Sequence, residues 1–190
     1  MLFNSYTFIF LFLPLAWVGF YAIARMGGPK PARIWLLLAS LVFYAWWNPI
    51  HLPLLLGSMV LNFWLAREIG RVSRSRVERK ALLIAGLVLN VGALAWFKYA
   101  DFVLRSTLGT LGYEVEPTGI MIPLAISFFT FQQIAYIVDA YREPGEKRPF
   151  LDYCLFVSFF PQLVAGPIIH HNEILPQLGG REPYTPRWSN

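Results

Sequence analysis

Apolar residues occur in long runs along this chain, and short connectors rich in charge, proline or glycine separate the runs. A helix needs about 20 predominantly apolar residues to cross a bilayer. The pattern therefore predicts an all-α integral membrane protein with about six hydrophobic segments, of which five are spans and one is broken or re-entrant. These segments lie approximately at 6–24, 34–47, 52–66, 81–97, 120–138 and 153–169, and together form a single polytopic membrane region over 1–190.

Two of the boundaries depend on particular residues. The first 24 residues carry no charge and lack the basic start of a signal peptide, so the first segment is expected to remain as a span. The uncharged stretch 34–66 is too long for one ordinary helix and is expected to break at Asn48-Pro49. His51 is expected to be solvated at this turn, beside a belt of interfacial aromatic side chains formed by Tyr44, Trp46 and Trp47.

The connectors predict an orientation. Connector 67–80 holds six Lys or Arg residues and two Glu. Alternating crossings with the N-terminus outside would place connectors 25–33, 67–80 and 139–152 inside, and these hold 12 Lys or Arg residues. The outside connectors 48–51, 98–119 and 170–190 hold four. This bias is typical of cytoplasmic loops. An ordinary positive-inside loop explains connector 67–80, and a specific lipid site at the headgroup plane is the alternative.

Composition supports the membrane class. The chain is 56% hydrophobic and 14% charged, whereas soluble domains have about 45–50% apolar and about 25% charged residues. The net charge of +5 lies in the connectors, so it indicates topology and not nucleic-acid binding. The single cysteine, Cys154, excludes an intrachain disulfide and is expected to be a small buried side chain.

The motifs of soluble enzymes and metal sites are missing from the sequence. His170 and His171 are adjacent, and their side chains would diverge on a helix. Polar residues and helix breakers instead gather in the last two segments, where they either bond neighbouring helices or line a passage. Asp139 and Arg142 share a helical face, as a capping ion pair or as an anchor for a charged acyl donor or partner. The full set of channel candidates is Ser127, Thr130, Gln132, Asp139, Arg142, Ser158, Pro161, Gln162, Gly166 and Pro167.

Several blocks of sequence resemble the membrane-bound O-acyltransferase family, of the bacterial alginate O-acetyltransferase type. The opening residues 1–14, the stretch 38–49 and Phe97-Lys98-Tyr99 are similar to that family. The most specific blocks are 123–132, 138–142 and 158–167. The resemblance covers nearly all of the chain, in the family's order, and implies a partial membrane-bound O-acyltransferase fold.

The resemblance implies a polytopic enzyme of the bacterial inner membrane that O-acetylates an extracytoplasmic polysaccharide such as alginate. It implies an acetyl or other acyl donor, no bound cofactor, and partners among extracytoplasmic acetyltransferases or polysaccharide-export proteins. The family's catalytic histidine lies downstream of the Ala165-Gly166-Pro167 block. The chain is therefore expected to be an N-terminal portion, and no catalytic role passes to His51, His170 or His171.

Two other classes of function stay open at this stage. A non-catalytic membrane scaffold or partner-docking subunit would also need polar groups between its helices. A small transporter would use broken helices near the midplane, but no span here contains Asp, Glu, Lys or Arg.

Overall fold

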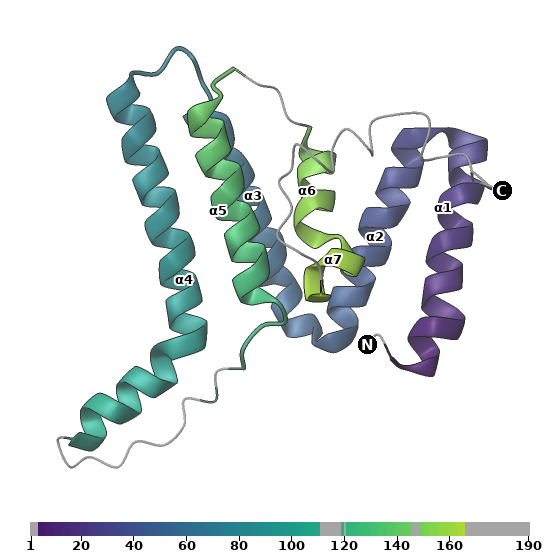
Figure 1. Ribbon diagram of the computed structural model, residues 1–190, viewed down its shortest axis with the longest axis horizontal. Helices are drawn as coiled ribbons and strands as arrows, with labels where there is room; N and C mark the ends of the chain where they lie inside the picture. Colours follow the sequence, from purple (N-terminus) through teal and green to yellow (C-terminus); the bar gives the residue numbers. More distant parts are fainter. Residues whose placement is uncertain (1–3, 111–118, 120, 146–148, 166–190) are drawn as a thin grey trace. The chain divides into compact units, whose positions relative to one another are not determined.

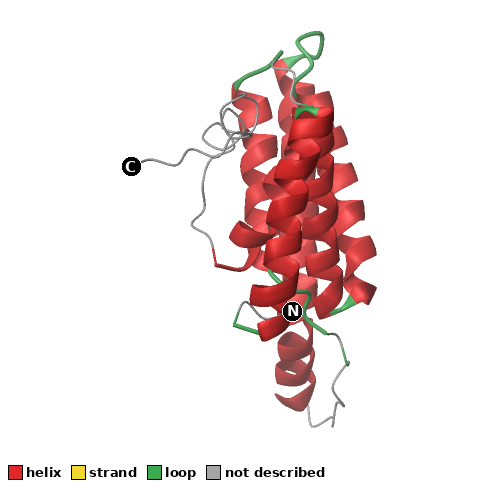
Figure 2. Cartoon of the chain, turned by 90° about the vertical axis from the view of Figure 1, so that its right-hand side faces the viewer, coloured by secondary structure: helices red, strands yellow, loops and turns green. Residues whose placement is uncertain are grey.

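The computed structural model describes residues 4–110, 119, 121–145 and 149–165, and it contains helices and loops but no strand in these ranges (Figure 2). The elements, in chain order, are η1 (Phe8–Phe12), α1 (Leu13–Gly27), α2 (Pro29–Trp47), η2 (Pro49–His51), α3 (Leu52–Ile69), α4 (Arg76–Thr110), α5 (Ile126–Arg142), α6 (Phe150–Ser158) and α7 (Phe160–Ala165) (Figure 1). The all-helical prediction is confirmed for this part of the chain.

Three of the described helical stretches are long and apolar enough to cross a membrane: Phe8–Gly27, Pro49–Ile69 and Arg76–Leu108. Helix occurs within the described part of each expected segment, although residues 121–125 of the fifth are not helical and 120 and 166–169 lie outside the described residues. The count of six spans is not confirmed. The expected second segment lies in α2, the fifth in α5, and the sixth is divided between α6 and α7. The described part of the chain is therefore all-helical and contains three candidate spans.

The fourth segment is longer than the sequence pattern predicts. A polar connector was expected from residue 98, yet α4 continues to Thr110. No proline interrupts this stretch, and Asp101 and Arg105 form an i,i+4 ion pair at 3.9 Å that supports the added turns. At 1.5 Å per residue, its 35 residues measure about 50 Å, more than the roughly 30 Å of a hydrocarbon core.

The chain divides into two compact units. The first contains 1–63 and 146–190, and the second contains 64–145, so that α3 contributes to both. In the first unit, α1 and α2 form a helical hairpin with one residue, Gly28, between them (Figure 1). Gly28 has φ 81°, a conformation that glycine adopts at little cost, and Pro29 then starts α2 without needing a donor N–H.

Aromatic packing forms the core of the first unit. Phe8, Phe12, Phe43 and Phe160 lie with ring centroids 5.2–6.2 Å apart, in edge, tilted and stacked arrangements. Aromatic pairs at such separations add to the energy of burial. The cluster joins η1, α2 and α7, three elements distant in sequence.

The predicted break at Asn48-Pro49 is confirmed. Asn48 is extended, as a residue before proline prefers, and its Oδ1 accepts a hydrogen bond from the Ile50 N–H at 3.1 Å. The expectation of a solvated His51 is wrong: the residue is 8% exposed, and its Nδ1 has no hydrogen-bond partner in the part of the chain that the structure describes. Tyr44 is also buried, whereas Trp46 and Trp47 are exposed as expected of a belt.

In the second unit α4 and α5 lie side by side (Figure 1). Their close approach depends on Gly86 of α4. A Cβ atom there would lie 2.9 Å from Ile137 Cδ1 and 3.3 Å from Leu65 Cδ1. Small residues at helix contacts allow this approach in membranes, where helix packing replaces the hydrophobic driving force.

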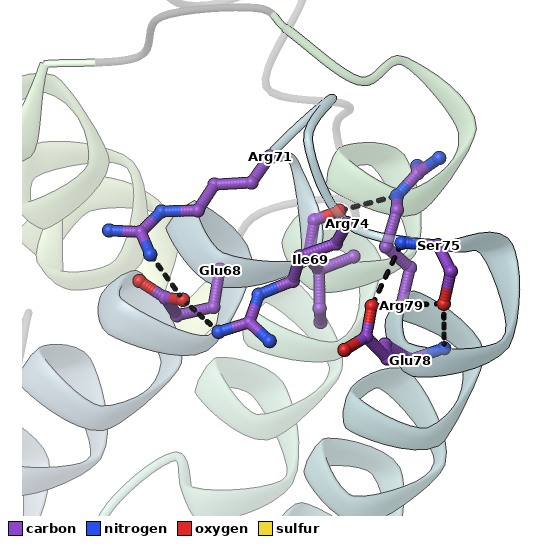
Figure 3. A network of polar contacts seen from close by, with 7 residues as sticks. All are labelled: Glu68, Ile69, Arg71, Arg74, Ser75, Glu78 and Arg79. Carbon is purple, nitrogen blue, oxygen red and sulfur yellow. Dashed lines mark hydrogen bonds and ion pairs between the residues drawn. The ribbon is translucent and has the colours of Figure 1, made fainter.

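A network of polar contacts fixes the helix ends of the second unit (Figure 3). Ser75 and Glu78 form a capping box at the start of α4: the Glu78 carboxylate accepts from the Ser75 N–H at 2.9 Å, and the Ser75 hydroxyl accepts from the Glu78 N–H at 3.3 Å. Glu68 is buried at the end of α3 and pairs with Arg71 at 3.0 Å and Arg74 at 2.5 Å.

Arg79 joins the ends of two helices. Its Nε donates to the carbonyl oxygen of Ile69, the last residue of α3, at 2.6 Å. Its guanidinium also donates to the carbonyl oxygen of Tyr141, in the last turn of α5, and lies 5.1 Å from the centre of the Tyr141 ring. A cation at a helix C-terminus satisfies free carbonyls and interacts favourably with the helix dipole.

Replacing Arg79 with Met should lower the free energy of unfolding by about 2–4 kcal/mol, because two hydrogen bonds to a charged donor are lost. Arg79→Lys keeps the charge but not the planar guanidinium, so its free energy of unfolding should lie between those of the Met variant and the unmodified chain. Arg76→Met, one turn earlier on the same helix, should change stability by less than about 0.5 kcal/mol. Thermal unfolding in detergent measures all three, and equal effects of the Arg76 and Arg79 substitutions would contradict the capping role.

Candidate functional site

The candidate residues of the fifth segment all lie on α5, in the second unit. Thr130 and Gln132 are buried, Ser127 and Asp139 are partly exposed, and Arg142 is exposed at the helix end. Arg79 binds the carbonyl of Tyr141 between Asp139 and Arg142, so the α5 terminus that carries the two charged candidates is held by α4.

Gln132 differs from the other buried polar residues of α5. Gln132 is 1% exposed, and neither its Oε1 nor its Nε2 has a hydrogen-bond partner among the described residues. One turn before and one turn after it on the helix are Phe129 and Tyr136, both buried. An unpaired buried amide costs about 1–3 kcal/mol per group, so this arrangement is unfavourable in the structure as it stands. Such a group calls for an explanation.

The entry to α5 carries a second local cost. Ala125 has φ 55° and ψ 22°, the left-handed region, and is the only described non-glycine residue with positive φ. No side chain caps the helix there. Strain of this kind costs about 1–3 kcal/mol and is concentrated at functional positions in proteins. Ala125 lies inside block 123–132, one of the three blocks whose resemblance to the family is most specific.

The candidates of the sixth segment lie in the first unit, on α6 and α7. The Ser158 hydroxyl donates to the Cys154 carbonyl at 2.7 Å, and Phe159 then leaves the helical conformation. Side-chain bonding of this kind bends helices. Pro161 is exposed in the first turn of α7, where its missing N–H is tolerated, and Gln162 is buried. The broken-helix alternative is thus observed as far as residue 165.

Ser40 holds this break in place. Its hydroxyl donates to the Leu36 carbonyl at 2.8 Å and accepts from the Phe160 N–H at 3.3 Å, with the side chain fully buried. The Ser40 contact joins α2 to α7, and an ion pair between Arg33 and Asp152 at 2.6 Å joins α2 to α6. The sequence pattern did not identify either contact, because the partners are about 120 residues apart and each residue is unremarkable in its own segment.

The remaining candidates, Gly166 and Pro167, lie outside the described residues, as do His170, His171 and the end of the sixth segment. The α5 candidates belong to the second unit, and the α6–α7 candidates belong to the first. Within the described residues no group of His, Cys, Asp or Glu side chains could hold a metal ion. Cys154 is free and buried, as expected.

Comparison with known proteins gives a consistent result. The chain is 42% identical over 94% of its length to the peptidoglycan O-acetyltransferase of Helicobacter pylori. It is 36% identical over 95% of its length to the probable alginate O-acetylase AlgI of Pseudomonas aeruginosa, and 37% identical to that of Azotobacter vinelandii. It spans 38%, 35% and 36% of the lengths of these relatives, respectively.

No protein-family model matches the chain, and no solved structure matches it significantly. The relatives are nevertheless all named for one chemistry, O-acetylation, and each aligns with almost all of this chain. The resemblance to the membrane-bound O-acyltransferase family is therefore confirmed: this chain corresponds over nearly its whole length to a part of bacterial O-acetyltransferases of that family.

Proposed function

We propose that this chain forms part of a membrane-bound enzyme that transfers an acetyl group to hydroxyls of a cell-envelope polysaccharide. The observation that carries the proposal is the alignment of almost the whole chain with relatives named for O-acetylation of two different polymers. In such a transfer the acceptor oxygen bonds to the acetyl carbonyl carbon, the donor's bond to that carbon breaks, and the hydroxyl proton passes to a base. No residue of this chain is assigned as that base.

The expected contribution of α5 is a polar wall within an apolar region. Thr130 and Gln132 are buried on a helix whose other buried residues are mostly apolar or aromatic, including Phe129, Tyr136 and Ile137, together with Gln133. A passage for an acetyl group needs low polarity to exclude water and a few hydrogen-bonding groups to orient the carbonyl or hydroxyl. Gln132 offers both a donor and an acceptor without a charge.

A chimera tests the activity. The chain would be joined to the remaining segments of the Helicobacter pylori relative and reconstituted with labelled acetyl donor and polysaccharide. We expect label on the polysaccharide hydroxyls with the chimera and none with the 190-residue chain alone. A chimera that folds, as judged by thermal unfolding, but transfers no acetyl group would overturn the proposed function. Transfer by the short chain would place the base within residues 1–190.

Gln132 can be tested separately in the same chimera. Gln132→Leu removes two unpaired buried groups and should raise the free energy of unfolding by about 1 kcal/mol or more. It should also lower acetyl transfer by at least about tenfold, because a hydrogen bond to the substrate is lost. The matched control is Gln133→Leu on the same helix: Gln133 has a partner in the structure, so its loss should destabilise. If Gln132→Leu lowers the free energy of unfolding as much as Gln133→Leu does, Gln132 bonds a neighbouring helix instead.

We also infer a bacterial inner-membrane location, with the N-terminus outside and the α3–α4 turn in the cytoplasm. The excess of Lys and Arg in the three inside connectors supports this orientation. Ser75 and Ser73 are exposed in that turn. A cysteine at Ser73 should react with a membrane-impermeant thiol reagent in inverted vesicles but not in intact spheroplasts, and the reverse result would invert the topology. Native Cys154 is buried and should give a low background.

A further inference from the structure

One face of α4 changes from cationic to apolar along its length. Arg76, Lys80, Ile84 and Val88 follow each other at i,i+4 spacing and are all exposed, with Ile84 51% and Val88 65% accessible. Residues at this spacing lie one above the other on a helix. We call these four residues the α4 ladder. Val77, beside its cationic end, is 78% exposed.

The two cations of the ladder have no ion-pair partner among the described residues. Like charges at i,i+4 disfavour a helix in water. The nearest carboxylates in sequence are engaged elsewhere, since Glu68 pairs with Arg71 and Arg74, and Glu78 accepts from Ser75 (Figure 3). No ion pair involves Arg76 or Lys80 within the part of the chain that the structure describes.

The length of the α4 ladder matches the thickness of one lipid leaflet. From residue 76 to residue 88 an α-helix rises about 18 Å, and one leaflet with its headgroups is about 20 Å thick. A phospholipid presents an anionic phosphate followed by an acyl chain, which is the same order as two cations followed by Ile84 and Val88. An acidic protein partner would match the cations but not the apolar continuation.

We propose that the α4 ladder binds one anionic phospholipid, with the phosphate between Arg76 and Lys80 and an acyl chain along Ile84 and Val88. An Arg and a Lys one turn apart can both donate to one phosphate. The site is distinct from the candidate passage on α5 and does not require acetyl transfer. A lipid site also differs from an ordinary positive-inside loop, because the orientation set by such a loop depends only on its number of cations.

Native mass spectrometry of the full chain in detergent tests the site, with phosphatidylglycerol, phosphatidylcholine and glycerol 1-phosphate as probes. We expect one phosphatidylglycerol to be retained in preference to phosphatidylcholine, and no retention of glycerol 1-phosphate. The double variant Arg76→Gln/Lys80→Gln should weaken phosphatidylglycerol binding about thirtyfold, since each basic residue near an anionic headgroup contributes about a fivefold gain. If this variant unfolds, Lys80→Gln alone should weaken binding about fivefold.

The matched control removes two exposed cations from the α1–α2 turn, on the same predicted side of the membrane: Arg25→Gln/Lys30→Gln. Binding should stay within about twofold of the unmodified chain. Equal losses in the two double variants would show that only total charge matters and would overturn the site. Equal retention of the two phospholipids would also overturn it, as would binding of glycerol 1-phosphate as tight as that of the lipid.

Discussion

The need to pair every backbone polar group underlies the architecture of this chain. Inside a bilayer no water is available to a free N–H or C=O, so spanning segments must be helical and helix ends need partners. The described chain meets this need in different ways at different ends. Gly28 and Pro29 change direction between α1 and α2, Asn48 caps the turn before α3, and Arg79 donates to carbonyls at the ends of α3 and α5.

Several buried polar side chains meet the same constraint, and Gln132 is among those that do not. Ser40, Asn62, Asn90 and Ser158 are buried, and each donates to the carbonyl four residues earlier at 2.7–2.9 Å. Such bonds let a polar residue occupy an apolar helix without an unpaired donor. Gln132 has no such bond, although its longer side chain carries two groups to satisfy. This contrast is the physical reason to separate Gln132 from the other candidates.

The two proposals concern different regions of the second unit and different chemistry. Gln132 is neutral and buried on α5, which suits a substrate that needs orientation without charge. The α4 ladder is cationic at one end and exposed, which suits a molecule that stays in the leaflet. The polar contacts of Glu68 and Arg79 connect the end of α3 with the start of α4 and keep the turn between these helices ordered. An ordered turn holds the ladder cations at fixed spacing, which favours binding of one lipid over a diffuse charge effect.

The sequence by itself determined the helical class, the position of most helices and the break at Asn48-Pro49, because apolar runs and X-Pro sterics act locally. Its blocks also identified the family that the relatives bear out. Local pattern could not determine that Ser40 would bind the Phe160 N–H or that Arg79 would cap α5, because these pairs are 120 and 62 residues apart. Nor could it predict that Gln133 has a partner whereas Gln132 has none among the described residues, or that His51 is buried. Those distinctions depend on which neighbours surround a side chain, and only the tertiary structure decides that.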